Sequence, residues 1–285
     1  GVGLIFASDA SGWNVLPRAI RRFAGAENED CTLVPSAVTS RELDDWLAEY
    51  LKAHARTERM ILYQQVRPGV PGELVDLVGR ALRFCQRRQV RNRWLRVLFL
   101  FDPESTWQWL ALPTSERLRL EEEADTALWP RPWTASAVRH RLAQRDMMDK
   151  DEQGTSAALK ATGGWHYLLD VLWARCGQET DLRPKAREME QELSDPRSQL
   201  AADFRSRLGI DRNEVARRVL RFVMIEGKDG LDEELLAPDL IEGGPRLSEV
   251  QCDQAKEYLL RLGLLRRENQ VLWVDPVVAQ VMAGE

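Results

Sequence analysis

The chain has 285 residues, of which 44% are hydrophobic and 30% charged, with 18 glycines and 13 prolines. This composition is typical of a globular protein and excludes a disordered or collagen-like chain. At about 150 residues per domain, the length predicts two domains, or one domain with a small appendage. Lys and Arg together number 40 against 45 acidic residues, so the net charge of −5 excludes a basic surface over the whole protein but leaves room for a local basic face.

The cysteines and histidines are few and far apart in the sequence. No Cys-x-x-Cys or Cys/His cluster is present, which argues against a zinc site and against a disulfide framework and favours a reducing, cytoplasmic compartment. No apolar run reaches the ~18–20 residues of a membrane span, and no signal-peptide pattern is present. Because the chain opens directly on an apolar run without an initiator Met, we expect a domain of a longer protein. The cysteines are Cys31, Cys85, Cys176 and Cys252, and the histidines are His54, His140 and His166.

Predicted strands and helices alternate from the start of the chain to Trp129. The strands are short runs that are apolar on both faces, which is typical of a buried parallel sheet covered by helices on both sides. We therefore predict an α/β domain over residues 1–132. The predicted strands are Val2–Phe6, Cys31–Val34, Met60–Tyr63, Leu95–Phe101 and Thr126–Trp129, and the predicted helices are Val15–Phe23, Arg41–Ala53 and Glu73–Gln89.

Beyond residue 132 the predicted elements are mainly helical. Helical spacing predicts a helical domain over residues 133–208, followed by helices and a two-stranded hairpin, the order of a winged helix, over residues 209–285. The predicted helices of the first part are Thr134–Gln144, Ala157–Thr162, Trp165–Cys176 and Arg183–Arg207. Those of the second part are Asn213–Glu226, Leu247–Leu262 and a closing helix from Asp275, with strands Leu264–Arg267 and Gln270–Trp273.

The turn after the first strand has the layout of a phosphate-binding loop without its chemistry. A working loop, Gly-x4-Gly-Lys-[Ser/Thr], holds phosphates with backbone N–H groups, a lysine charge and a hydroxyl that binds Mg²⁺. Here Ala7 stands at the first glycine and Gly12 at the second, whereas Trp13 replaces the lysine and Asn14 the hydroxyl residue. Asp9 adds a negative charge. Taken alone, this pattern is more often an ordinary strand–turn–helix.

The acidic pair of such an ATPase is also replaced. Gln64 and Gln65 follow the Met60–Tyr63 strand where carboxylates would hold Mg²⁺ and orient water, and a neutral amide cannot act as a general base. Taken alone, two glutamines at a strand end are ordinary surface residues. Asp102, before Pro103, is more simply a helix N-cap than a metal ligand.

In their order and spacing these segments resemble an AAA+/STAND-type ATPase module with a helical lid and a winged helix. The resemblance implies a P-loop NTPase-like fold, with Asp102 near the sensor position. It also places His166 where the lid's proline lies against the nucleotide and Gly164 in the lid's glycine pair. No arginine follows that pair at the second sensor position unless Arg175 folds back. The matching stretches are GVGLIFASDASGWNVLPRAI, RMILYQQ, LRVLFLFDPESTW, ALWPRPWTASAVRHRLA and ATGGWHYLLDVLW.

Loss of the lysine, the hydroxyl and both carboxylates predicts a catalytically inactive module without cofactor or metal. We expect it to act as a scaffold or regulatory domain, binding a protein partner or other domains of a larger chain, in a setting that the resemblance suggests is bacterial. One alternative is an NTPase completed by a neighbouring subunit. The other is a DNA-binding component that uses the winged helix and an arginine-rich face. The arginines for nucleic acid or an acidic partner are Arg80, Arg83, Arg87, Arg261, Arg266 and Arg267, with Arg88, Arg91 and Arg93 nearby.

Overall fold

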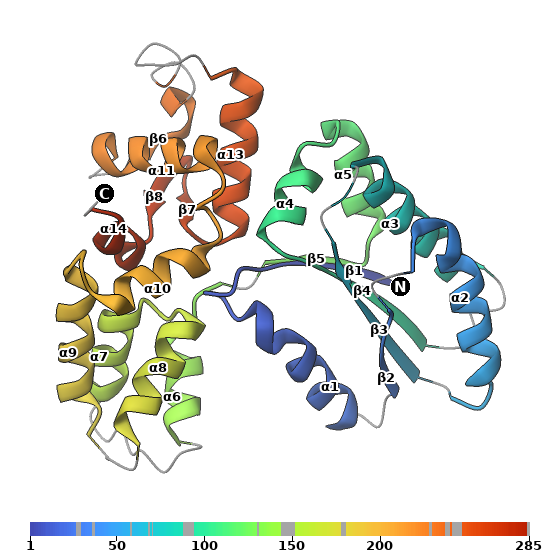
Figure 1. The fold of residues 1–285 in the computed structure, drawn as a ribbon, viewed down its shortest axis with the longest axis horizontal. Coiled ribbons are helices and arrows are strands. Elements are labelled where there is room, and N and C mark those ends of the chain that lie inside the picture. The colour runs from blue at the N-terminus through green and yellow to red at the C-terminus, as the bar shows by residue number, and fades with distance from the viewer. Residues whose placement is uncertain are drawn as a thin grey trace. The chain divides into compact units, whose positions relative to one another are not determined.

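The computed structural model describes residues 1–26, 30–35, 38–57, 59–67, 69, 71–87, 94–129, 131–143, 152–177, 181–227, 230–236, 240 and 247–283. The chain divides into two compact units (Figure 1). We call Gly1–Ala7 with Trp13–Trp129 the sheet unit, and Ser8–Gly12 with Pro130–Glu285 the helical unit. The middle of the expected phosphate loop, Ser8–Gly12, thus belongs with the helices, whereas Ala7, Trp13 and Asn14 belong to the sheet unit. The division into 1–132, 133–208 and 209–285 stays a prediction.

The sheet unit contains a five-stranded parallel sheet with the strand order β2-β3-β4-β1-β5. This arrangement confirms the predicted parallel α/β sheet. Its strands are β1 (Val2–Phe6), β2 (Asp30–Leu33), β3 (Arg59–Val66), β4 (Trp94–Phe101) and β5 (Thr126–Leu128). Its helices are α1 (Leu16–Ala26, after a 3-10 turn over Trp13–Val15), α2 (Ser40–Ala53), α3 (Pro71–Gln86), α4 (Pro103–Leu110) and α5 (Thr114–Glu123).

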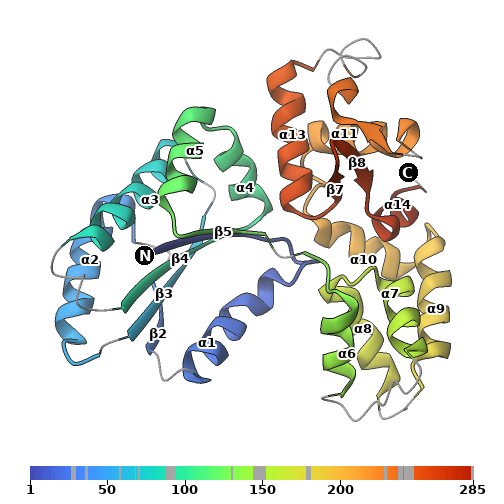
Figure 2. The same cartoon turned by 180° about the vertical axis from the view of Figure 1, so that it is seen from behind.

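The strand order explains how the helices divide between the two faces of the sheet. Crossovers between parallel strands are right-handed, so the direction in which the chain moves across the sheet selects the face that carries the connecting helix. Only the β1–β2 connection runs toward the β2 edge, and the later connections all run the other way. Accordingly α1 lies alone on one face, while α2, α3, α4 and α5 cover the other (Figures 1 and 2).

The main core of the sheet unit lies on the face covered by α2–α5. Leu4, Phe6 and Phe99 are fully buried there, and the ring of Phe6 stacks on that of Phe101 with centroids 4.8 Å apart. Trp109 of α4 is also fully buried against these rings. These side chains alternate along their strands, as the period-2 geometry of a strand requires.

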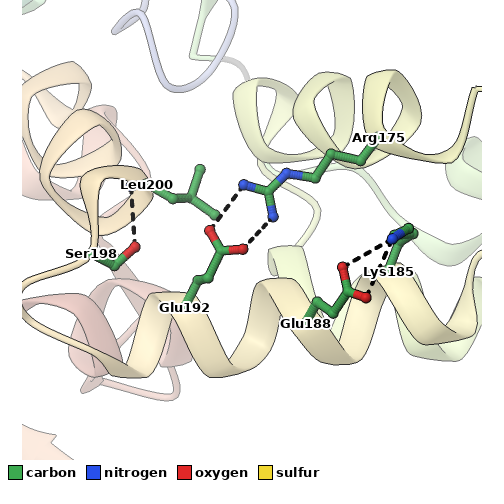
Figure 3. A network of polar contacts seen from close by, with 6 residues as sticks. All are labelled: Arg175, Lys185, Glu188, Glu192, Ser198 and Leu200. Carbon is green, nitrogen blue, oxygen red and sulfur yellow. Dashed lines mark hydrogen bonds and ion pairs between the residues drawn. The ribbon is translucent and has the colours of Figure 1, made fainter.

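The helical unit begins with five helices: α6 (Ala135–Ala143), α7 (Gln153–Thr162), α8 (His166–Cys176), α9 (Arg183–Ser194) and α10 (Gln199–Leu208). The expectation of one helix over Arg183–Arg207 is wrong, because α9 ends at Asp195 with an extended backbone (ψ 111°). Pro196 disfavours the helical conformation of the residue before it and has no N–H for the helix. Ser198 then caps α10 by accepting the N–H of Leu200 (Figure 3).

The chain continues with a mixture of helices and short antiparallel strands. The strand order is β6-β8-β7, so the predicted two-stranded hairpin is extended by β6, which is too short to leave a periodic signal in the sequence. These elements are α11 (Glu214–Glu226), β6 (Leu231–Asp232), a 3-10 turn over Glu233–Leu235, α13 (Glu249–Arg261), β7 (Leu265–Glu268), β8 (Val271–Val274) and α14 (Pro276–Met282). Among the described residues, no helix is long and apolar enough to cross a membrane.

Candidate functional site: the loop at the phosphate-binding position

The loop Ser8–Gly12 forms a tight turn that is closed by its own hydrogen bonds. The Ser8 N–H donates to the Ser11 hydroxyl oxygen at 2.9 Å, and the Ser11 N–H donates to the Ser8 carbonyl at 3.1 Å. The Gly12 N–H donates to the Asp9 carbonyl at 3.3 Å. Gly12 is the residue for which this turn needs glycine, since its φ is +99°.

The same loop is hydrogen-bonded to two helices of the helical unit. The Ala10 N–H donates to the carbonyl of Arg207 near the end of α10, at 3.0 Å. The Ala10 carbonyl accepts the N–H of Tyr167, in the first turn of α8, at 3.1 Å. Ala10 itself is fully buried, and the Arg207 guanidinium lies over the Tyr167 ring, 4.4 Å from its centroid.

These bonds decide what the loop can bind. A phosphate-binding loop works because its backbone N–H groups converge on the anion and have no other acceptor. Here the N–H groups of Ser8, Ala10, Ser11 and Gly12 all donate to acceptors of the protein. The N–H of Ala7 is also used, donating to the Phe101 carbonyl at 3.0 Å. These five N–H groups are therefore not available to the phosphates of a nucleotide.

Trp13 and Asn14 occupy the 3-10 turn that leads into α1. The Trp13 side chain is half-buried and the Asn14 side chain is exposed. Neither offers a cation or a hydroxyl, so no side chain here replaces the missing lysine or the missing Mg²⁺ ligand. Pro17 also removes one N–H from the first turn of α1.

Gln64 and Gln65 lie inside β3, not after it as the sequence indicated. The strand runs on to Val66 because Gln64 and Gln65 pair in register with Phe99 and Leu100 of β4. Gln64 is 3% exposed, so the view of both glutamines as surface residues is wrong for Gln64 and right for the exposed Gln65.

The Gln64 side chain has a structural role at the carboxyl end of β3. Its amide Nε2 donates to the Val38 carbonyl at 3.1 Å, which ties the strand to the segment before α2. Its Oε1 is buried without a hydrogen-bond partner beside a cavity of about 140 Å³. Such a cavity has room for water, which would donate to this oxygen. An amide in this place neither carries a charge for Mg²⁺ nor accepts a proton from water.

Asp102 is a helix cap, as the sequence predicted. Its carboxylate accepts the Ser105 N–H at 2.7 Å and the Ser105 hydroxyl at 2.6 Å, and Pro103 occupies the first helical position of α4. Both bonds go to one oxygen of the carboxylate, Oδ1, which therefore serves as the cap. No group of three His, Cys, Asp or Glu side chains among the described residues is arranged to hold a metal ion.

The glycine pair of the expected lid forms a turn against the segment before α6. Gly164 has φ +80°, and its carbonyl accepts the Trp133 N–H at 2.7 Å. His166, at the start of α8, sets its ring edge-on to that of Trp133 at 5.7 Å, and its Nδ1 lies 3.4 Å from an Asp170 carboxylate oxygen. The His166 ring therefore packs against groups of its own unit.

Arg175 does not fold back as a sensor arginine. Its two terminal nitrogens donate to the two carboxylate oxygens of Glu192 in α9, at 2.7 and 2.9 Å (Figure 3). These hydrogen bonds raise the pKa of Arg175 and lower that of Glu192. Arg175 thus joins α8 to α9, next to a second ion pair between Lys185 and Glu188.

The arginines of the sheet unit that were predicted to contact an acidic partner differ in exposure and pairing. In the sheet unit, Arg87 lies just beyond α3 and pairs with Asp44 at 2.7 Å, Arg83 is exposed and Arg80 is half-buried. Arg88, Arg91 and Arg93 fall outside the described residues.

The C-terminal arginines are also largely engaged. Arg261 is 4% exposed, so including it in a surface patch is wrong: its position on α13 turns it into the core. Arg267 pairs with Glu233 and Glu257, both at 2.9 Å, and Arg266 is exposed. On β7 both Arg266 and Arg267 are exposed, but the charge of Arg267 is neutralised by two glutamates, which makes a weak match to a phosphate backbone.

Tyr167 and Arg207 are the residues that sequence reasoning missed. Both engage the loop through backbone atoms, which any residue type could supply, so nothing in their side chains could have indicated the contact. Only the folding of the chain brings these distant residues to Ala10.

Comparison with known proteins supports the fold and nothing finer. No protein-family model matches the chain, and no curated protein sequence matches it. A Walker-type ATPase of Pyrococcus abyssi is similar in structure, with a TM-score of 0.50 and 12% identity over 99% of this chain and 91% of that one. The ORC2 protein of Aeropyrum pernix, solved in ADPNP and ADP complexes, has a TM-score of 0.48 and 12% identity over 99% of this chain and 87% of that one. The chain has a P-loop ATPase-like α/β fold built on a parallel sheet.

Proposed function

We propose that this chain is a catalytically inactive module of the AAA+/STAND type that acts as a protein-interaction scaffold or regulatory domain. The observation that carries the proposal is the state of the loop's N–H groups. Those of Ser8, Ser11 and Gly12 donate within the loop's own turn, and that of Ala10 donates to α10, while the Ala10 carbonyl accepts an N–H of α8. A loop bonded in this way stabilises the helical unit by connecting α8 and α10.

The side chains at the catalytic positions support the same proposal. Trp13 and Asn14 supply neither the charge nor the hydroxyl, and Gln64 and Gln65 supply no carboxylate. Asp102 caps α4 and Arg175 pairs with Glu192. The lysine, the hydroxyl and the acidic pair that would contact the phosphates, the metal and the attacking water are thus all absent.

We further propose that the elements from α11 to α14 form a winged helix used for packing. The helix α13, which would enter a DNA groove, carries Glu249, Asp253 and Glu257 against one lysine, Lys256. That lysine pairs with Glu233 at 2.9 Å and with Asp253 at 2.8 Å. A helix with this charge would repel the phosphate backbone, and DNA binding is therefore the weaker alternative.

The test is a titration of the chain with ATP and ADP, with and without Mg²⁺, followed by calorimetry and by melting temperature. We expect no heat and no shift, whereas a ligand at 100 times its Kd would add about 2.7 kcal/mol of stability. Mg²⁺-dependent hydrolysis that a Gln65→Ala change abolishes would overturn the proposal.

A double variant separates the two reasons for inactivity. Trp13→Lys with Asn14→Thr restores the side-chain chemistry but leaves the N–H groups engaged, so we expect it to remain unable to bind ATP. The matched control is Trp94→Lys, which places a lysine at a tryptophan of the same unit that is 40% exposed. ATP binding by the double variant, with none by the control, would show that the engaged N–H groups are not the barrier.

A further inference from the structure

The face of the sheet opposite α2–α5 carries an apolar groove. Because only the β1–β2 connection crosses this face, α1 alone covers a sheet of five strands (Figures 1 and 2). A recess of about 310 Å³ lies between α1 and strands β1, β3, β4 and β5. We call this recess the α1 groove; the large apolar side chains that line it include Ile5, Ile20, Phe23, Leu98 and Leu128.

Helix α1 packs loosely on the sheet beneath it. Ile20, on its sheet-facing side, is only half-buried, and Phe23 is 60% exposed. On the opposite wall, Leu128 of β5 is 54% exposed. A helix that completes a core buries its apolar face at close-packed density, and α1 does not. Apolar side chains of this size gathered around one recess are typical of a site that binds a protein, a membrane or a small ligand.

The border of the α1 groove is positively charged. Helix α1 carries Arg18, Arg21 and Arg22 and no acidic residue, and Arg96 of β4 lines the groove itself. Arg96 lies over the Trp94 ring at 5.0 Å, and the Arg21 Nε donates only to a backbone carbonyl of its own helix at 3.3 Å. Within the described part of the chain, none of these arginines is paired with a carboxylate.

We propose that the α1 groove binds an acidic amphipathic helix of a partner protein. The partner would insert apolar side chains between α1 and the sheet, and its carboxylates would face Arg18, Arg22 and Arg96. A second copy of this chain fits poorly, because a symmetric contact through this face would set arginine against arginine. A flat anionic membrane fits poorly too, because the apolar side chains line a recess and do not project from a plane. This inference names a partner class for the scaffold role proposed above.

The experiment uses the full chain and a synthetic peptide about five helical turns long, with leucines on one helical face and glutamates on the other. Fluorescence anisotropy of the labelled peptide is measured at 50 and 300 mM NaCl. We expect saturable binding that weakens at high salt. A peptide of the same composition in scrambled order, and one with lysine in place of glutamate, should each bind at least tenfold more weakly.

Variants of the chain locate the site. Leu128→Glu, and separately the double change Arg18→Glu with Arg22→Glu, should each weaken peptide binding at least tenfold. The matched controls are Ile225→Glu, at a side chain 66% exposed in the helical unit, and Arg212→Glu, at an exposed arginine there; neither should change binding. All substituted side chains are exposed or border the recess, and melting curves show whether each variant folds as the parent does.

Three peptide results would overturn the inference: no binding of the acidic peptide, equal binding of the scrambled peptide, or equal loss of binding in the control variants. A fourth would be saturable binding of another ligand in place of the peptide, tested with phosphatidylserine vesicles for a membrane and with dodecanoate for a fatty acid. Nucleotide titration tests the loop and peptide titration tests the groove. Each can therefore fail while the other succeeds.

Discussion

The carboxylate of Asp275 joins two distant parts of the helical unit, and its removal is the sharpest test of how that unit is held together. Asp275 is 3% exposed and caps α14: its Oδ1 accepts the N–H groups of Val277 at 3.0 Å and Val278 at 3.3 Å. The same oxygen accepts the indole N–H of Trp165 at 3.1 Å. Trp165, 1% exposed, directly precedes α8, 110 residues earlier in the chain.

Two changes at this position separate the hydrogen bonds from the charge. Asp275→Ala removes the cap, which costs about 0.5–2 kcal/mol, and leaves the buried Trp165 N–H without an acceptor, which costs about 1–3 kcal/mol. We expect a combined loss of about 2–4 kcal/mol and a fall in Tm of roughly 4–16 °C for a unit of this size. Asp275→Asn keeps an oxygen in place and removes a buried charge, so it should stay within about 1 kcal/mol of the parent.

The pH dependence of stability provides the second readout. Burial raises the pKa of Asp275 above its ordinary 3.8, although the Trp165 hydrogen bond opposes the shift. A raised pKa means that the folded protein holds the proton more tightly than the unfolded chain. The parent should therefore lose stability as the pH rises from 3.8 through the folded-state pKa, and Asp275→Asn should lack this loss.

The assay is urea unfolding followed by circular dichroism at several pH values between 4 and 7. The reasoning is refuted if Asp275→Ala lies within about 0.5 kcal/mol of the parent, the usual range of a neutral surface change. It is also refuted if Asp275→Asn is as damaging as Asp275→Ala, because the charge and not the hydrogen bonds would then matter.

Three further predictions concern single positions. Gly164→Ala should destabilise the chain by about 2–4 kcal/mol, because a Cβ would lie 2.3 Å from the Trp133 carbonyl at a φ of +80°; an unchanged melting temperature would contradict this. Gly25→Ala, where a Cβ meets nothing within 4 Å, is its matched control and should raise stability by about 0.5 kcal/mol. Glu192→Gln should cost about 0.5–1 kcal/mol at pH 7, since both partners are partly exposed and screened. The hydrogen bond from Arg175 lowers the pKa of Glu192 below 4.5, so the stability cost of Glu192→Gln should disappear as the pH falls through the lowered pKa. If the stability difference between variant and parent does not change with pH, the ion pair is not the source of the cost.

Much of the sheet unit could be predicted from local sequence. Apolar runs located the strands, and the Asp102-Pro103 pair located the start of α4, because capping and burial depend on neighbouring residues. The prediction failed where pairing with another strand decided the outcome, as for Gln64 and Gln65 within β3. It failed again at Pro196, where the helical spacing of the flanking residues hid a break that backbone sterics require.

The loss of catalytic chemistry was visible in the sequence, because a lysine or a carboxylate is either present at a position or absent. Whether the loop could still cradle a phosphate was not visible, because backbone N–H groups are the same in every non-proline residue. Their acceptors lie in the loop's own turn and, for Ala10, at Arg207 far along the chain. The burial of Arg261 and the open groove under α1 likewise depend on packing between distant segments. The chemistry of each side chain can be read directly from the sequence. The hydrogen-bond partner of each backbone group, and the segment that packs on each apolar face, are decided only when the chain folds.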